Sequence, residues 1–135
     1  MYRARHKCGL VFALSLVIAH AAPAQSSNAA WQATPASILK STLRDVVAAQ
    51  DKYRATHPGF ASSVEALRVS PGSDVTVQIL GVTSSAWRAK ATHKARPGRS
   101  CVVFVGKLRA TEFPRTDGDG EMAGEERVPL CDRME

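Results

Sequence analysis

A chain of 135 residues is long enough for one ordinary domain and too short for two of that size, and it contains no internal repeat. It has 18 Lys and Arg residues against 12 Asp and Glu, a formal net charge of +6. Arg3, Arg5 and Lys7 lie in the first seven positions, so a chain without them has 15 basic and 12 acidic residues, or +3. A charge of this size bears on association and solubility rather than on fold.

The first 24 residues predict a secretory signal peptide. A basic start is followed by an apolar run from Leu10 to Ala22. A small-x-small exit then fits cleavage after Ala24 or after Ala21. An exported protein, periplasmic or secreted, is the expected consequence.

A membrane-anchoring helix is the alternative interpretation of this start. It needs about 20 apolar residues, and the polar tract from Gln25 to Asn28 follows too soon. We therefore expect a signal peptide over residues 1–24, a flexible lead-in over 25–33 and one globular domain over 34–135. No membrane span is expected once the leader is removed.

The next pattern predicts a helix from Pro35 to Thr56. Thr34 can cap its start, proline is tolerated at the first helical position, and His57-Pro58-Gly59 ends it. His57 is more readily interpreted as a cation at the helix end than as a catalytic base. Apolar and large residues recur at steps of three and four along one side, namely Leu39, Leu43, Val46, Val47, Gln50 and Tyr53.

A short helical turn and then a change of period follow. Ser62 to Glu65 matches a capping box ahead of Ala66 and Leu67. Val75 to Ile79 alternates apolar with polar residues, and so does the segment from Trp87, in which Ala89 and Ala91 alternate with Arg88, Lys90 and Thr92. Alternation predicts two strands with one buried and one exposed face.

The third predicted strand, Ser100 to Gly106, is apolar on both faces, as in a strand covered on both sides. Phe113 to Gly124 is a predicted loop, and Val128 to Cys131 a short edge strand. One long helix followed by three or four antiparallel strands gives an α+β fold.

Two cysteines remain after the leader, which contains Cys8, is removed. In an exported domain Cys101 and Cys131 favour a disulfide that closes the C-terminal loop. A reactive or metal-bound thiol, with His57 or His93 as its partner, is the alternative, although no C-x-x-C or H-x-x-x-H spacing supports it.

Charge is segregated along the second half of the chain. Basic residues on the second strand and just after it, Arg88, Lys90 and Lys94, are candidates for an anion-binding surface. The acidic loop that follows is the one weak candidate for a metal site. Its alternating carboxylates, Asp117, Asp119 and Glu121, fit calcium, and a solvated loop is the alternative, because the EF-hand pattern fails at Met122 and Val128.

The residues around the end of the predicted helix resemble those of type IV pilins and type II secretion pseudopilins. In that family an A-Q-x-x-Y-x helix tail precedes a G-x-[YF] turn and an S-x-x-x-L segment. Matching positions here are Gln50, Tyr53, Phe60, Ser63 and Leu67.

The likeness continues into the strands and covers residues 38–131. Ala86 to His93 is similar to the family's F-x-A-x-A-x-H strand, and Gly98-x-x-Cys101-x-Val103 is similar to the strand that bears its first disulfide cysteine. The resemblance implies a pilin-like roll. The N-terminus departs from the family, because Leu14 stands where a glutamate is expected and the tract from Pro23 interrupts the apolar helix.

These patterns together predict a soluble, exported, pilin-like structural or binding module of the cell envelope. We expect it to be monomeric in isolation and accessory to a type IV pilus or type II secretion assembly. Binding of an anionic polymer, DNA or envelope polysaccharide, is the alternative. We expect no enzyme and name no catalytic residue, because the sequence has no G-x-S-x-G elbow, metal-binding helix pair or phosphate loop.

Overall fold

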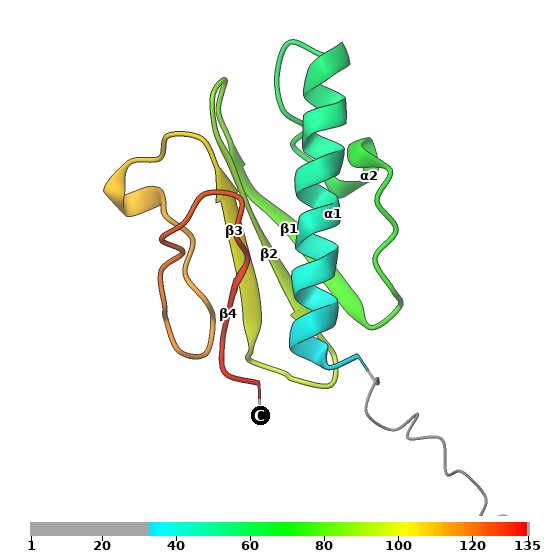
Figure 1. Cartoon of the computed structure of the whole chain (residues 1–135), viewed down its shortest axis with the longest axis vertical. Helices are drawn as coiled ribbons and strands as arrows, with labels where there is room; N and C mark the ends of the chain where they lie inside the picture. Colours follow the sequence, from blue (N-terminus) through cyan, green and yellow to red (C-terminus); the bar gives the residue numbers. More distant parts are fainter. Residues whose placement is uncertain (1–32, 135) are drawn as a thin grey trace, which may run out of the picture. The chain divides into compact units, whose positions relative to one another are not determined.

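The computed structural model describes residues 33–134, which form an α+β fold with one long helix and a four-stranded antiparallel sheet (Figure 1). The predicted signal peptide, residues 1–24, lies outside the described residues, as does the predicted lead-in up to residue 32. In chain order the elements are α1 (Pro35–Thr56), α2 (Val64–Leu67), β1 (Val75–Val82), β2 (Trp87–His93), β3 (Ser100–Val105), a short 3-10 helix (Ala110–Glu112) and β4 (Leu130–Cys131). None of the helices in this range is long and apolar enough to cross a membrane.

Helix α1 begins and ends at the predicted residues. The Thr34 hydroxyl accepts a hydrogen bond from the N–H of Ser37 at 3.2 Å, and Pro35 occupies the first turn. The helix ends at His57, whose backbone is extended, as the following proline requires. Its buried face is formed by Leu39, Thr42, Leu43, Val46, Val47 and Gln50. The apolar stripe of α1 therefore packs in the interior of the domain.

The strands form an antiparallel meander in the order β1-β2-β3-β4. Strands β1 and β2 pair from Val75 with His93 to Val82 with Trp87, and the register shifts between Ile79 and Gly81. Leu80 is the extra residue of this bulge. Strands β2 and β3 pair without interruption from Trp87 with Val105 to Thr92 with Ser100.

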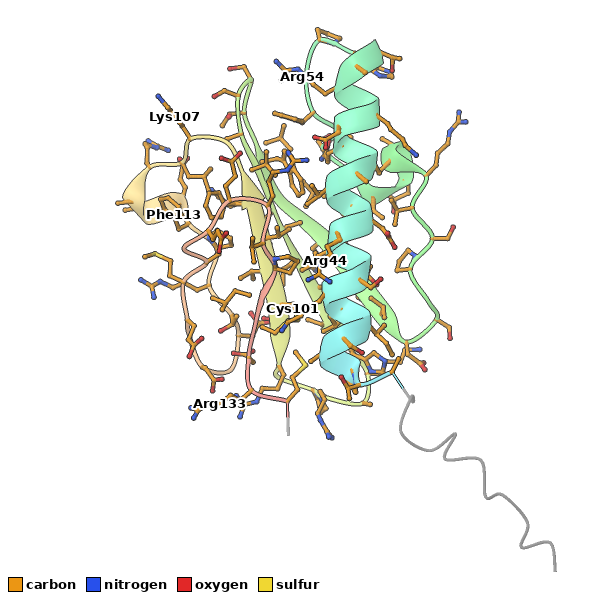
Figure 2. The ribbon with its side chains drawn as sticks, in the orientation of Figure 1. Arg44, Arg54, Cys101, Lys107, Phe113 and Arg133 are labelled. Atoms are coloured by element: carbon orange, nitrogen blue, oxygen red, sulfur yellow. A yellow bond between two sulfur atoms is a disulfide. The ribbon has the colours of Figure 1, made fainter. Side chains whose placement is uncertain are left out.

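Strand β3 lies in the middle of three layers and is buried along its whole length. On one side α1 and the sheet share the main apolar cluster, which includes Leu43, Trp87 and Val103. On the other side Val102 and Phe104 pack with Ala123 and Phe113 of the C-terminal loop, residues 106–129, which connects β3 to β4. Figure 2 shows Phe113 on that loop. Coverage on both faces confirms the expectation from its unbroken apolar sequence.

A disulfide joins Cys101 of β3 to Cys131 of β4, as predicted. The two residues lie opposite each other in the strand register, and the bond closes a loop of 30 residues. A ring of that length stabilises a fold by roughly 3 to 4 kcal/mol in the chain-entropy model. The bond fixes β4 to the centre of the sheet.

The connection from α1 to α2 is held by polar contacts. The buried Gln50 amide accepts from the N–H of Ala61 at 2.9 Å and donates to its carbonyl oxygen at 2.8 Å. The short helical turn is confirmed, but its cap is one residue later than the capping box predicts. Ser63 accepts from the N–H of Ala66, so Glu65 stands one position too early to reach back to the cap.

Candidate functional site

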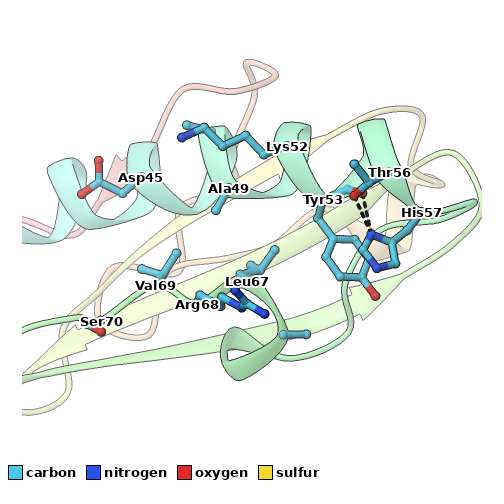
Figure 3. Close-up of a pocket in the computed structure, with 12 residues that line it drawn as sticks. Asp45, Ala49, Lys52, Tyr53, Thr56, His57, Leu67, Arg68, Val69 and Ser70 are labelled. Carbon is cyan, nitrogen blue, oxygen red and sulfur yellow. Dashed lines mark hydrogen bonds between the residues drawn. The ribbon is translucent and has the colours of Figure 1, made fainter.

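A groove of about 720 Å³ runs between α1 and the segment formed by α2 and residues 68–70. Figure 3 shows Ala49 and Tyr53 of α1 facing Leu67 and Val69 across it. These side chains give the groove an apolar floor, and polar side chains stand along its margins. The complete lining comprises Asp45, Ala48, Ala49, Lys52, Tyr53, Thr56, His57, Ala66, Leu67, Arg68, Val69 and Ser70.

One end of the groove is closed by two stacked rings. The rings of Tyr53 and His57 lie 3.8 Å apart and are nearly parallel. His57 Nδ1 is 3.0 Å from the carbonyl oxygen of Tyr53 and 2.9 Å from the hydroxyl of Thr56. These contacts tie the ring to the last turn of α1, which is the structural position that the sequence predicts for it.

The charged residues of the groove have no ion-pair partners in the described part of the chain. Lys52 and Arg68 are both exposed, and no Asp or Glu oxygen of residues 33–134 lies within 4.0 Å of either cationic group. Arg68 has a left-handed backbone (φ 55°), and its N–H donates to the carbonyl oxygen of Glu65. Asp45, at the other end, also forms no ion pair there.

The predicted anion-binding residues do not form one free surface. Lys90 is bound to Asp117, with Nζ 3.0 Å from Oδ1, and Lys94 lies 3.7 Å from a carboxylate oxygen of Asp74. The sequence predicts that Arg88 and Lys90 point from an exposed face, but both are half-buried, because the C-terminal loop lies over this side of β2. Two of the three cations already have carboxylate partners.

Two of the three predicted calcium ligands, Asp117 and Asp119, contact protein cations, whereas Glu121 is exposed and forms no ion pair within residues 33–134. Asp119 accepts from Arg99 at 2.7 Å and from the N–H of Arg133 at 2.8 Å, and Asp117 pairs with Lys90. Within residues 33–134 no three His, Cys, Asp or Glu side chains gather in an arrangement that could hold a metal ion. The carboxylates of Asp117 and Asp119 attach this loop to β2, to Arg99 just before β3 and to the C-terminal segment.

The carboxylate of Asp132 holds this loop in place, and no pattern in the sequence predicts this role. It is buried and accepts from the N–H groups of Ser100, Gly118 and Asp119 at 2.8, 2.9 and 2.6 Å. Burial alone would raise the pKa of Asp132, but the hydrogen bonds from the Thr116 side chain and from these N–H groups outweigh it and lower the pKa to about 2. Its position directly after Cys131 is the only sequence signal, and that signal is weak.

No protein-family model matches the chain, and no curated protein matches it either. The likeness to pilins and pseudopilins therefore depends on the short motifs quoted above. Gln50 and Ser63, two residues of those motifs, fix the connection between α1 and α2. That connection leads into the segment that forms one wall of the groove.

Proposed function

We propose that this protein is an exported, pilin-like structural and binding module of the cell envelope, accessory to a type IV pilus or type II secretion assembly. The observation that carries the proposal is the arrangement of one long helix on an antiparallel meander whose last strand is closed by a disulfide. The motifs that resemble those of the pilin family lie on α1, on α2 and the connection that precedes it, and on β2 and β3. No catalytic role is proposed.

An accessory role, rather than that of a filament-shaft subunit, follows from the surface of α1. Its aliphatic side chains Leu39, Leu43, Val46 and Val47 are buried against the sheet, so they are not available to pack against other helices. Among the described residues, the large apolar side chains with substantial exposure are Leu80, Met122 and Val128, which lie on three different segments. A helix-packing surface would require a contiguous apolar patch.

Export is the second part of the proposal. A basic and apolar leader supports it at the start of the sequence, and a disulfide is stable in an oxidising compartment. The domain is proposed to act in the periplasm or outside the cell, as a monomer in isolation.

The test is the N-terminal residue of the protein after expression in a piliated bacterial host, together with its fractionation. A first residue of Gln25 or Ala22, in a detergent-free fraction, is the expected result. Co-purification with the pilus or secretion assembly after mild cross-linking is also expected. A first residue of Leu10 in sheared filaments would overturn the accessory role and indicate a shaft subunit.

Binding of DNA or an envelope polysaccharide through Arg88, Lys90 and Lys94 is the weaker alternative. The ion pairs of Lys90 and Lys94 would have to break for those cations to bind a polymer. Binding of this kind weakens steeply as salt rises, since each phosphate contact releases counterions. A salt titration with single-stranded and duplex DNA distinguishes the two functions.

A further inference from the structure

We propose that the groove between α1 and α2 binds an extended acidic peptide segment of a partner protein, with a carboxylate of that segment bound by Lys52 and Arg68. The proposal rests on the proposed function, because it names the kind of partner that a binding module of the envelope would hold. It places the binding site away from Arg88, Lys90 and Lys94, the residues for which the sequence predicts anion binding.

Charge is the first argument. Six other basic side chains of the described residues are in ion pairs, namely Lys90, Lys94, Arg99, Arg109, Arg127 and Arg133. Lys52 and Arg68 are exposed, line the same groove and have no such partner there. Seven other Lys and Arg side chains of residues 33–134 also form no ion pair, so what distinguishes Lys52 and Arg68 is that both line this groove, where a carboxylate supplied from outside can pair with them.

Shape is the second argument. From Asp45 to Thr56 the groove follows α1 for 12 residues, or about 18 Å at 1.5 Å per residue. An extended peptide of about five residues covers that length at 3.3 Å per residue. The floor of Ala49, Tyr53, Leu67 and Val69 is apolar, so it can receive small apolar side chains that flank the acidic residue.

The same geometry disfavours an anionic polymer. Duplex DNA carries a charge every 1.7 Å or so, roughly ten charges over the length of the groove. Figure 3 shows Lys52 and Arg68 between Asp45, at one end of the groove, and the rings of Tyr53 and His57, at the other. A polyanion would bring several unpaired charges close to Asp45, whereas a segment with a single acidic residue would not.

Titration of the exported, disulfide-bonded protein with two synthetic peptides tests the proposal. One peptide is acetyl-Ala-Ala-Glu-Leu-Ala-amide, and its matched control carries Gln in place of Glu. The acidic peptide should shift the backbone amide NMR signals of residues 45–57 and 66–70, and the Gln peptide should bind clearly more weakly. Lys52→Glu and Arg68→Glu should each weaken the binding of the acidic peptide by about three- to tenfold, since exposed ion pairs are worth up to 1 kcal/mol or so and reversal adds repulsion.

Lys107→Glu is the matched control, because it makes the same charge change at an exposed residue on the other side of the sheet (Figure 2). It should leave the affinity within about twofold. Equal weakening by Lys107→Glu, shifts outside the groove, or no shift at millimolar peptide would overturn the proposal. So would a polyuronate oligomer or single-stranded DNA that binds the groove more tightly than the peptide.

The peptide assay uses purified protein and does not depend on cell fractionation. A protein that joins the envelope assembly but binds no acidic peptide would overturn the assignment of the groove alone. A protein that binds the peptide but carries Leu10 at its N-terminus in filaments would overturn the accessory role and leave the groove assignment intact.

Discussion

The two faces of the sheet are covered in different ways. On one face α1 buries a row of aliphatic side chains in one cluster with Trp87 and Ala89. On the other face the C-terminal loop contributes a smaller apolar cluster and is fixed by the disulfide and by Asp132. Apolar burial is non-directional, so the stabilisation on the helix side is distributed over many side chains. The loop side depends on a few specific bonds, each of which can be removed singly.

The largest expected effect is on the helix face. Trp87 is 1% exposed, and its Nε1 has no hydrogen-bond partner among the described residues. Trp87→Ala should lower the free energy of unfolding by about 3 to 5 kcal/mol, because it leaves a large cavity. Trp87→Phe should cost clearly less, since the phenyl ring fills part of that cavity and the indole N–H has no hydrogen bond to lose. Urea unfolding of the oxidised protein measures both, and equal losses would contradict the dependence on cavity size.

Removal of the disulfide should have the next largest effect, and it should act on the loop face. The double variant Cys101→Ser and Cys131→Ser should lose roughly 3 to 4 kcal/mol. Hydrogen exchange should speed up at Gly118 and Asp119, whose N–H groups bind the residue after Cys131, more than at Val46 in α1. Mass analysis of the exported wild type should find no free thiol at Cys101 or Cys131, and two titratable thiols would contradict the bond.

Loss of the Asp132 carboxylate should follow in size. Asp132→Asn keeps one acceptor oxygen but leaves buried N–H groups without a partner, at a cost of about 1 to 3 kcal/mol. Asp117→Asn is the matched control, since it removes a more exposed carboxylate of the same loop, and it should cost less than about 1 kcal/mol.

The same residue predicts a pH dependence. The folded-state pKa of Asp132, about 2, lies below its ordinary value of 3.8. Its contribution to stability is therefore complete above about pH 4 and is lost as the pH falls toward 2. Stability measured against pH should decline less in this window for Asp132→Asn than for the wild type. Parallel curves would contradict the assignment.

The smallest effects should come from the cations on the second strand. Lys90→Glu breaks the pair with Asp117 and should cost up to about 1 kcal/mol, because the pair is only half-buried. Arg88→Glu should stay within about 0.5 kcal/mol, as most surface changes do. Thermal unfolding measures the melting temperature of both variants. A larger decrease for Arg88→Glu than for Lys90→Glu would contradict this prediction.

Local patterns predict the helix side of this protein well. Thr34, Pro35 and the row from Leu39 to Gln50 define α1, and alternation around Trp87 identifies the inward face of β2. The apolar sequence of β3 predicts that both of its faces are covered. All of these signals depend on a regular period, which a single sequence displays directly.

The loop side and the groove could not be predicted in the same way. Lys90 and Asp117 are 27 residues apart, and the three N–H groups bound by Asp132 come from two distant segments. Bonds of this kind leave no repeating pattern in the sequence. The groove depends on the path by which the connection after α1 folds back onto the helix. One pair of hydrogen bonds between the Gln50 side chain and the Ala61 backbone fixes that path.

The bulge at Leu80 has a consequence for crowding. Strand β1 is at the border of the sheet, and its eight residues, Val75–Val82, include no charge and no proline. A border strand of this composition can template the addition of strands from other molecules. Because the register shifts between Ile79 and Gly81, the regular row of backbone groups is interrupted and the local twist increases. In this domain a backbone irregularity, rather than a charged side chain on the edge strand, thus hinders edge-to-edge pairing of β1 with other molecules at high local concentration.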